Sequence, residues 1–209
     1  MEDFEFTPET SHPKAKELLK EDFYWSDEDE TSPFGNDDGA EASFGFWKWR
    51  KKNKNVSPLK YLEKLLNEWD FPYFDLNELN SDKIQEYITQ NRDMDNGPFS
   101  GNMLADQLKQ MAAELEDDPE DNHFKELLAN VTGTSADNFL IGMDNAIIAV
   151  AFAQYALEGT LDTRLKALAQ TAIKRELNPL LLETFSEEYR SVRAEKLNKM
   201  LASLNLMKE

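Results

Sequence analysis

The chain of 209 residues carries 41 acidic and 23 basic side chains, a formal net charge of -18, and no cysteine. This length can bury one large core or two small ones without disulfides. The lack of cysteine excludes disulfides, thiolate nucleophiles and thiolate metal sites. The two histidines, His12 and His123, are too far apart in sequence to form a histidine zinc motif. The negative charge argues against general binding to nucleic acid or anionic membranes and favours a basic partner.

The charge is distributed unevenly along the chain. Residues 1–42 have a net charge of -11, residues 43–62 have six basic side chains and no acidic one, and residues 63–209 have a net charge of -13. A basic segment rich in Phe and Trp therefore separates two acidic blocks.

The start of the chain and its apolar runs predict a cytoplasmic protein. Residues 1–5 lack the basic and apolar regions of a signal peptide. The longest apolar run, residues 146–153, is much shorter than the roughly 20 residues that cross a bilayer. We therefore expect this run to form a buried core helix, and we expect no association with a membrane.

In the first half of the chain, the apolar spacing and the start signals predict helices. A short helix is expected over about 13–22, with Pro13 in its first turn. Residues 26–45, rich in Asp, Glu, Gly, Pro and Ser, predict an irregular acidic loop, although Phe44 to Arg50 favour a helix over a strand. Ser57-Pro58 predicts an N-cap followed by a helix, and Ser81 is expected to cap another.

The second half of the chain is predicted to be almost wholly helical after a polar, turn-rich boundary at residues 91–101. Asp137 or Asp144 is expected to cap the apolar helix that ends before Gly159. The remaining expected helices cover residues 104–115, 124–131 and 161–177, and two more begin at Asn178-Pro179 and after Ser186.

These elements predict an all-α fold, a helical bundle of about seven to nine helices with a long irregular acidic loop near the N-terminus. The expected organisation is an N-terminal region, 1–92, with the acidic loop, and a C-terminal helical bundle, 93–209, the two packing as one domain or as two.

The acidic loop holds the densest carboxylates of the chain. Asp27, Asp29, Asp37 and Asp38 provide oxygen atoms of the kind that bind Ca²⁺ or Mg²⁺, but their spacing fits no known cation loop. We favour a solvated acidic loop in which Asp37 or Asp38 caps the next helix. The alternative is a divalent-metal site that uses these four carboxylates.

The basic segment mixes aromatic rings with cations, as a surface that stacks bases and binds phosphates does. Trp47, Trp49 and Arg50 are its candidate binding residues, together with Trp25, Phe34, Asp37 and Asp38 from the preceding acidic block. We favour an intramolecular contact between the acidic block and the basic segment, with the tryptophans in the core. Binding of nucleic acid is the disfavoured alternative.

No catalytic set is found. His12 precedes a helix start and His123 lies in an acidic turn, and neither has a serine or second histidine placed to complete a catalytic site. A nucleophile-elbow motif, a phosphate loop and a dinucleotide-binding fingerprint are also absent from the sequence. We therefore expect no catalytic residues and no cofactor.

Several strings resemble two bacterial families. Residues 11–13, 23–25, 32–39, 49–50 and 57–62 resemble YfeS-like proteins. Residues 96–106 and 146–161 are similar to a small α-helical family with a Gly-Pro-Phe-x-Asn-Asp-Asp-Ala motif, from which this chain departs at Gly101-Asn102-Met103. The resemblance implies a bacterial helical protein and implies no established activity.

Taken together, these features predict a non-catalytic cytoplasmic binding protein, of the immunity type in one version, that recognises a basic protein partner. Two alternatives stay open at this point. One is a carboxylate-based, divalent-metal-dependent hydrolase, and the other is a nucleic-acid accessory protein.

Overall fold

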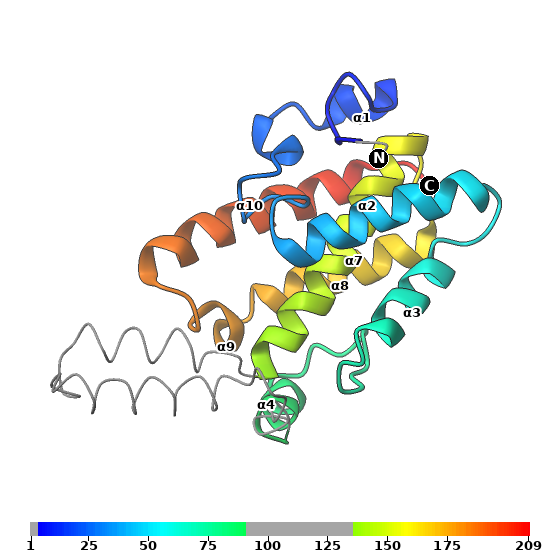
Figure 1. Ribbon diagram of the computed structural model, residues 1–209. Coiled ribbons are helices and arrows are strands. Elements are labelled where there is room, and N and C mark those ends of the chain that lie inside the picture. Colours follow the sequence, from blue (N-terminus) through cyan, green and yellow to red (C-terminus); the bar gives the residue numbers. More distant parts are fainter. Residues whose placement is uncertain (1–3, 91–135) are drawn as a thin grey trace, which may run out of the picture. The chain divides into compact units, whose positions relative to one another are not determined.

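The computed structural model describes residues 4–90 and 136–209. In this part of the chain it contains eight α-helices, one 3₁₀ helix and no strand, so the predicted all-α bundle is confirmed (Figure 1). The elements are α1 (Pro13–Leu18), η1 (Asp22–Trp25), α2 (Asp37–Lys52), α3 (Leu59–Glu68), α4 (Ser81–Gln90), α7 (Ala136–Glu158), α8 (Thr163–Glu176), α9 (Pro179–Leu182) and α10 (Glu187–Leu206).

The chain divides into two compact units. The first consists of Met1–Ser81 and Leu140–Glu209, and the second of Asp82–Phe139. This grouping differs from the predicted boundary at residue 92, because the first 81 residues share a hydrophobic core with residues after 140. Everything described below belongs to the first unit.

Helix α7 forms the centre of this unit, with α2, α8 and α10 around it (Figure 1). Its side chains from Ala146 to Ala153 are all almost completely buried. Helix α7 is long and apolar enough to cross a membrane. However, 89% of its apolar stretch is buried inside the protein, as in the core helix of a soluble protein. An apolar surface on every side suits a helix that is enclosed by others.

Aromatic side chains of the N-terminal segment and of α2 cover one side of this core. Phe4 stacks on Trp47 at 4.5 Å between ring centroids, and Phe6 stacks on Phe34 at 4.6 Å. Phe46 is fully buried. Large aromatic rings bury much apolar area each, so these contacts fix the N-terminal segment against α2 and against the loop that precedes it.

Two helix starts follow the predicted cap chemistry. The side chain of Asn178 accepts a hydrogen bond from the backbone of Leu180, and Pro179 begins α9. The Ser186 side chain accepts one from Tyr189 at the start of α10. A side-chain oxygen at these positions satisfies a backbone N–H group that the helix itself leaves unpaired.

Other predicted boundaries were wrong. The acidic loop is shorter than expected, because Asn36 rather than Asp37 or Asp38 caps α2, accepting a hydrogen bond from the Gly39 backbone. The first helix ends at Leu18, before the 3₁₀ turn η1. Ser57 does not cap α3, since its hydroxyl donates to Asp162 instead.

The start of α7 was also predicted too late. Asp144 was expected as a possible cap, but it lies inside the helix, is fully buried and binds Arg175. The predicted boundary at residues 91–101, the helices over 104–115 and 124–131, and His123 lie outside the described residues.

The two ends of the chain approach each other near the C-terminal end of α7 (Figure 1). The His12 backbone donates to the carbonyl of Ala156, and the Leu161 backbone donates to the carbonyl of Lys208. Gly159 ends α7 with φ of 65°, and a Cβ there would lie 2.2 Å from the His12 ring. This position therefore needs glycine for both conformation and space.

Candidate functional site

The acidic loop, residues 26–36, is a braced structure. The Ser26 hydroxyl accepts hydrogen bonds from the backbones of Glu28 and Asp29, and the Asp29 carboxylate accepts from the backbone and hydroxyl of Thr31. A Cβ on Gly35 would lie 2.2 Å from the Asp29 carbonyl oxygen. Side-chain bonds of this kind hold a loop in place where no helix ladder can.

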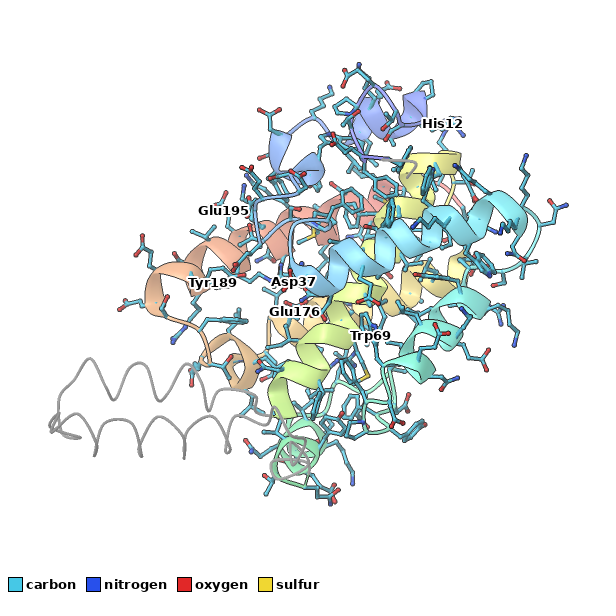
Figure 2. All side chains as sticks on the ribbon, viewed as in Figure 1. His12, Asp37, Trp69, Glu176, Tyr189 and Glu195 are labelled. Atoms are coloured by element: carbon cyan, nitrogen blue, oxygen red, sulfur yellow. The ribbon has the colours of Figure 1, made fainter. Side chains whose placement is uncertain are left out.

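This loop meets the start of α10 and forms a shallow hollow of about 430 Å³, which we call the acidic hollow. Tyr189 of α10, labelled in Figure 2, is half-buried, and Val192 is 42% exposed. All charged residues that line the hollow are acidic. The lining consists of Glu28, Asp29, Glu30, Thr31, Ser186, Glu188, Tyr189 and Val192.

Arg193 of α10 fastens the acidic loop to the core. Its guanidinium is buried and donates to the carbonyl of Thr31 at 3.2 Å, to the side chain of Asn145 at 2.8 Å and to Glu176 at 2.6 Å. Asp38 hydrogen-bonds to the same Asn145, and burial raises the pKa of Asp38. The polar side chains under the loop thus form one connected network.

Glu176 is the carboxylate at the base of this network (Figure 2). Its Oε2 accepts from Arg193, and its buried Oε1 has no hydrogen-bond partner within residues 4–90 and 136–209. Burial raises the pKa of Glu176, against the lowering effect of Arg193. The position of Oε1 agrees with the raised pKa. A proton on this buried oxygen removes the negative charge and so reduces the free-energy cost of burying the carboxyl group.

The second concave surface is a pocket of about 540 Å³, which we call the apolar groove. One wall is α3, the other is an irregular segment, residues 71–78, which we call the strap, and Met143 of α7 and Leu168 of α8 lie between them. Its apolar lining consists of Leu59, Leu62, Leu66, Phe71, Pro72, Tyr73, Phe74, Leu76, Met143 and Leu168. Its size is within the range of ligand sites.

Arg175 of α8 fastens the strap to the core. Its side chain is completely buried and donates to the carbonyls of Leu76 at 3.2 Å and Glu78 at 2.8 Å. It also pairs bidentately with Asp144, at 2.9 and 2.5 Å, and its guanidinium lies 5.2 Å from the centre of the Phe74 ring. The wall of the apolar groove thus depends on a buried ion pair.

The structure does not bring the four predicted metal-binding carboxylates together as a site. Asp27 and Asp37 are exposed, Asp29 braces the acidic loop, and Asp38 binds Asn145. Among the described residues, no three side chains of the types His, Cys, Asp or Glu are grouped so that they could hold a metal ion. The described carboxylates of the loop therefore have structural or solvent-exposed positions.

The predicted aromatic and basic binding residues serve mainly in packing. Trp25 is half-buried and donates to the Leu19 carbonyl, while Phe34 and Trp47 are buried. Trp49 is half-buried beside Phe46.

The basic segment uses its cations within the protein. Arg50 is only 8% exposed, pairs with Glu158 at 2.6 Å and donates to the carbonyl of Val56. Lys48 and Lys51 lie over aromatic rings of α2, at 3.9 and 3.7 Å from the ring centres. The expected partner of Arg50 was the acidic block of residues 1–42, whereas Glu158 comes from the end of α7.

Sequence reasoning missed the residues that form both concave surfaces. Tyr189 reads as part of the apolar pattern of the last helix, and Phe71, Pro72 and Phe74 read as a break after a helix. The one signal in this segment is its high aromatic content, with three aromatic residues in positions 71–74. Neither pattern shows which distant segment comes to lie opposite.

Comparison with known proteins gives no match: no family model, no curated protein and no solved structure is similar to this chain. The class that the structure defines is an all-α protein with a buried polar network beneath two concave surfaces. The resemblance of the sequence strings to YfeS-like proteins remains a prediction.

Proposed function

We propose that this protein is a non-catalytic cytoplasmic binding protein, of the immunity type, that recognises a basic protein partner through the acidic hollow. The observation that carries the proposal is the convergence of Glu28, Asp29, Glu30 and Glu188 around Tyr189, with acidic charge only. A hollow of one sign complements a partner of the opposite sign and speeds their encounter.

The chemistry of the hollow suits a Lys or Arg side chain. Tyr189 lines the hollow with an aromatic ring that packs against Phe185 at 5.0 Å between ring centroids, and burial raises the pKa of its hydroxyl, which stays protonated at neutral pH. Aromatic rings beside carboxylates bind guanidinium and ammonium groups by cation–π and ionic contacts together. Val192 adds apolar surface at the edge. Tyrosine is also enriched among residues that dominate binding energy.

The binding surface has a fixed shape before any partner arrives. Asp29, Ser26 and Thr31 brace the acidic loop from within, and Arg193 anchors it from below. A surface that is already ordered loses little conformational entropy on binding, which favours affinity.

The test is capture of partner proteins from the native host at low and high salt by three forms of the full chain. The test variant carries E28K, E30K and E188K. The matched control carries E5K, E17K and E68K, exposed acids outside the hollow, so that both variants change the net charge equally.

We expect the wild type and the control to retain a basic protein at low salt, and the hollow variant to lose it. Retention should weaken as salt increases, because the contacts are ionic. Equal loss in both variants would show that only total charge matters, and a neutral or acidic partner bound independently of salt would contradict the proposal outright.

A further inference from the structure

The apolar groove has an asymmetric distribution of charge along its length. At one end lie Ser57, Lys60 and Arg164, near the starts of α3 and α8, which the hydrogen bond from Ser57 to Asp162 joins. At the other end lies the strap with Phe71 and Phe74. The groove therefore runs from a polar, cationic end to an aromatic end.

Of the charged residues that line the groove, two are basic and one is acidic, and Asp162 lies beside them through its bond to Ser57. Lys60 and Glu63 both line the groove and pair with each other at 2.9 Å. The Arg164 side chain makes no hydrogen bond or ion pair with any other residue of the described chain. One unpaired guanidinium thus borders an apolar pocket in a protein whose overall charge is -18. This local charge is opposite to that of the acidic hollow.

We propose that the apolar groove binds a small amphiphilic anion, a ligand with an apolar chain and a carboxylate head. The carboxylate pairs with Arg164, and the chain lies along Leu62, Leu66 and Leu168 towards the aromatic strap. Arginine presents a fork of donors that matches a carboxylate. Burial of the chain supplies the apolar contribution to binding. This site is separate from the acidic hollow and independent of the function proposed for it.

The volume of the groove supports a small ligand in preference to one side chain of a partner. At about 540 Å³ it lies well inside the range of about 300–1,000 Å³ for sites that enclose small molecules. Because Lys60 pairs with Glu63, Arg164 is the lining cation left to bind the charged head, so the groove also fixes which end of the ligand carries the charge.

The test is titration calorimetry of the full chain with three probes of equal chain length, kept below their micelle concentrations. The probes are dodecanoate, dodecanol and dodecyltrimethylammonium. The variants are R164Q, which removes the cation, L168W, which fills the groove, and K174Q as control. Lys174 is an exposed cation on the same helix and does not line the groove.

We expect the wild type to bind one dodecanoate, and to bind dodecyltrimethylammonium much more weakly. R164Q should weaken dodecanoate binding by about tenfold to a hundredfold, as for the loss of one charged hydrogen bond, and leave dodecanol binding unchanged. K174Q should change neither. L168W should weaken the binding of all three probes, provided that circular dichroism shows that this variant is folded. If it is not folded, the result for R164Q decides the test.

The proposal is overturned if dodecanoate does not bind, or if the three probes bind equally well, which would mean that the groove does not recognise a carboxylate. The proposal would also be overturned if R164Q and K174Q weakened dodecanoate binding equally, because binding would then depend only on the net charge of the protein. The triple variant E28K, E30K and E188K should bind dodecanoate as the wild type does, so the two proposals can fail separately.

Discussion

The acidic loop and the strap are both irregular segments that a buried arginine fastens to the bundle, but they are fastened differently. Arg193 holds the acidic loop through one carbonyl, and the loop braces itself through Ser26, Asp29 and Thr31. Arg175 holds the strap through the carbonyls of Leu76 and Glu78.

The two carboxylate partners differ as well. Both oxygens of Asp144 accept hydrogen bonds from Arg175, whereas Oε1 of Glu176 has no donor in the part of the chain that the structure describes. Arg175 and Glu176 are neighbours on α8, and each belongs to the support of a different concave surface. The difference indicates that the groove depends more on its arginine than the acidic hollow does on Arg193.

The largest expected effect is that of R175M. Removing one partner of a buried ion pair leaves Asp144 uncompensated and should lower the free energy of unfolding by about 3–5 kcal/mol. Denaturant unfolding measures this change. The double variant D144L/R175M should be more stable than R175M, because it removes the orphaned charge, yet neither should bind dodecanoate. If R175M unfolds like the wild type, the strap does not depend on this pair.

The second prediction concerns the acidic loop. In G35A the new methyl group would meet the Asp29 carbonyl, so the backbone must shift, at a cost of roughly 1–3 kcal/mol in unfolding free energy. Thermal or denaturant unfolding should show this loss, together with weaker capture of the basic partner. Binding of dodecanoate should stay unchanged. If G35A also weakened dodecanoate binding, the acidic hollow and the apolar groove would not be independent.

The third prediction uses pH to test the protonation of Glu176, one of two buried carboxylates whose pKa is raised by burial, the other being Asp144 with a pKa of about 7. Because burial raises the pKa of Glu176 above its ordinary value of 4.5, the folded protein holds this proton more tightly than the unfolded chain. Its contribution to stability is present at low pH and is lost as pH rises through the raised pKa. The stability of E176Q relative to the wild type should therefore increase as the pH rises above about 4.5. A constant difference in unfolding free energy would contradict the raised pKa.

The smallest effect is expected at an exposed ion pair. Lys64 and Glu68 lie 3.2 Å apart on α3, with side chains 62% and 58% exposed. K64A should change the unfolding free energy by less than about 0.5 kcal/mol, because water and salt screen such pairs. Denaturant unfolding at low and high salt provides the comparison with R175M. A loss as large as that of R175M would remove the distinction between buried and exposed pairs.

The helical class and several helix starts could be predicted because they depend on neighbouring residues. The side chains of Asn178 and Ser186 cap the helices that directly follow them. The apolar run of α7 shows its central position by composition alone. These features need no knowledge of distant contacts.

The concave surfaces could not be predicted because they join segments far apart in the chain. The acidic hollow joins residues near 30 to residues near 190, and Arg175 binds carbonyls almost a hundred positions earlier. In the sequence, Arg175 and Glu176 look like an ordinary charged end of a helix. Asp144 looked like a cap for the same reason, since burial of a charge depends on a partner that local patterns do not show.

The division of the first unit into Met1–Ser81 and Leu140–Glu209 has a consequence during synthesis. Phe46 and Trp47 emerge from the ribosome with α2, but their core requires α7, which is complete only at Glu158. At a translation rate of about 5–20 residues per second, α7 is complete roughly 5–20 s after these aromatic residues have been synthesised. The nascent chain thus exposes an aromatic surface during this interval, when chaperone binding or aggregation competes with folding.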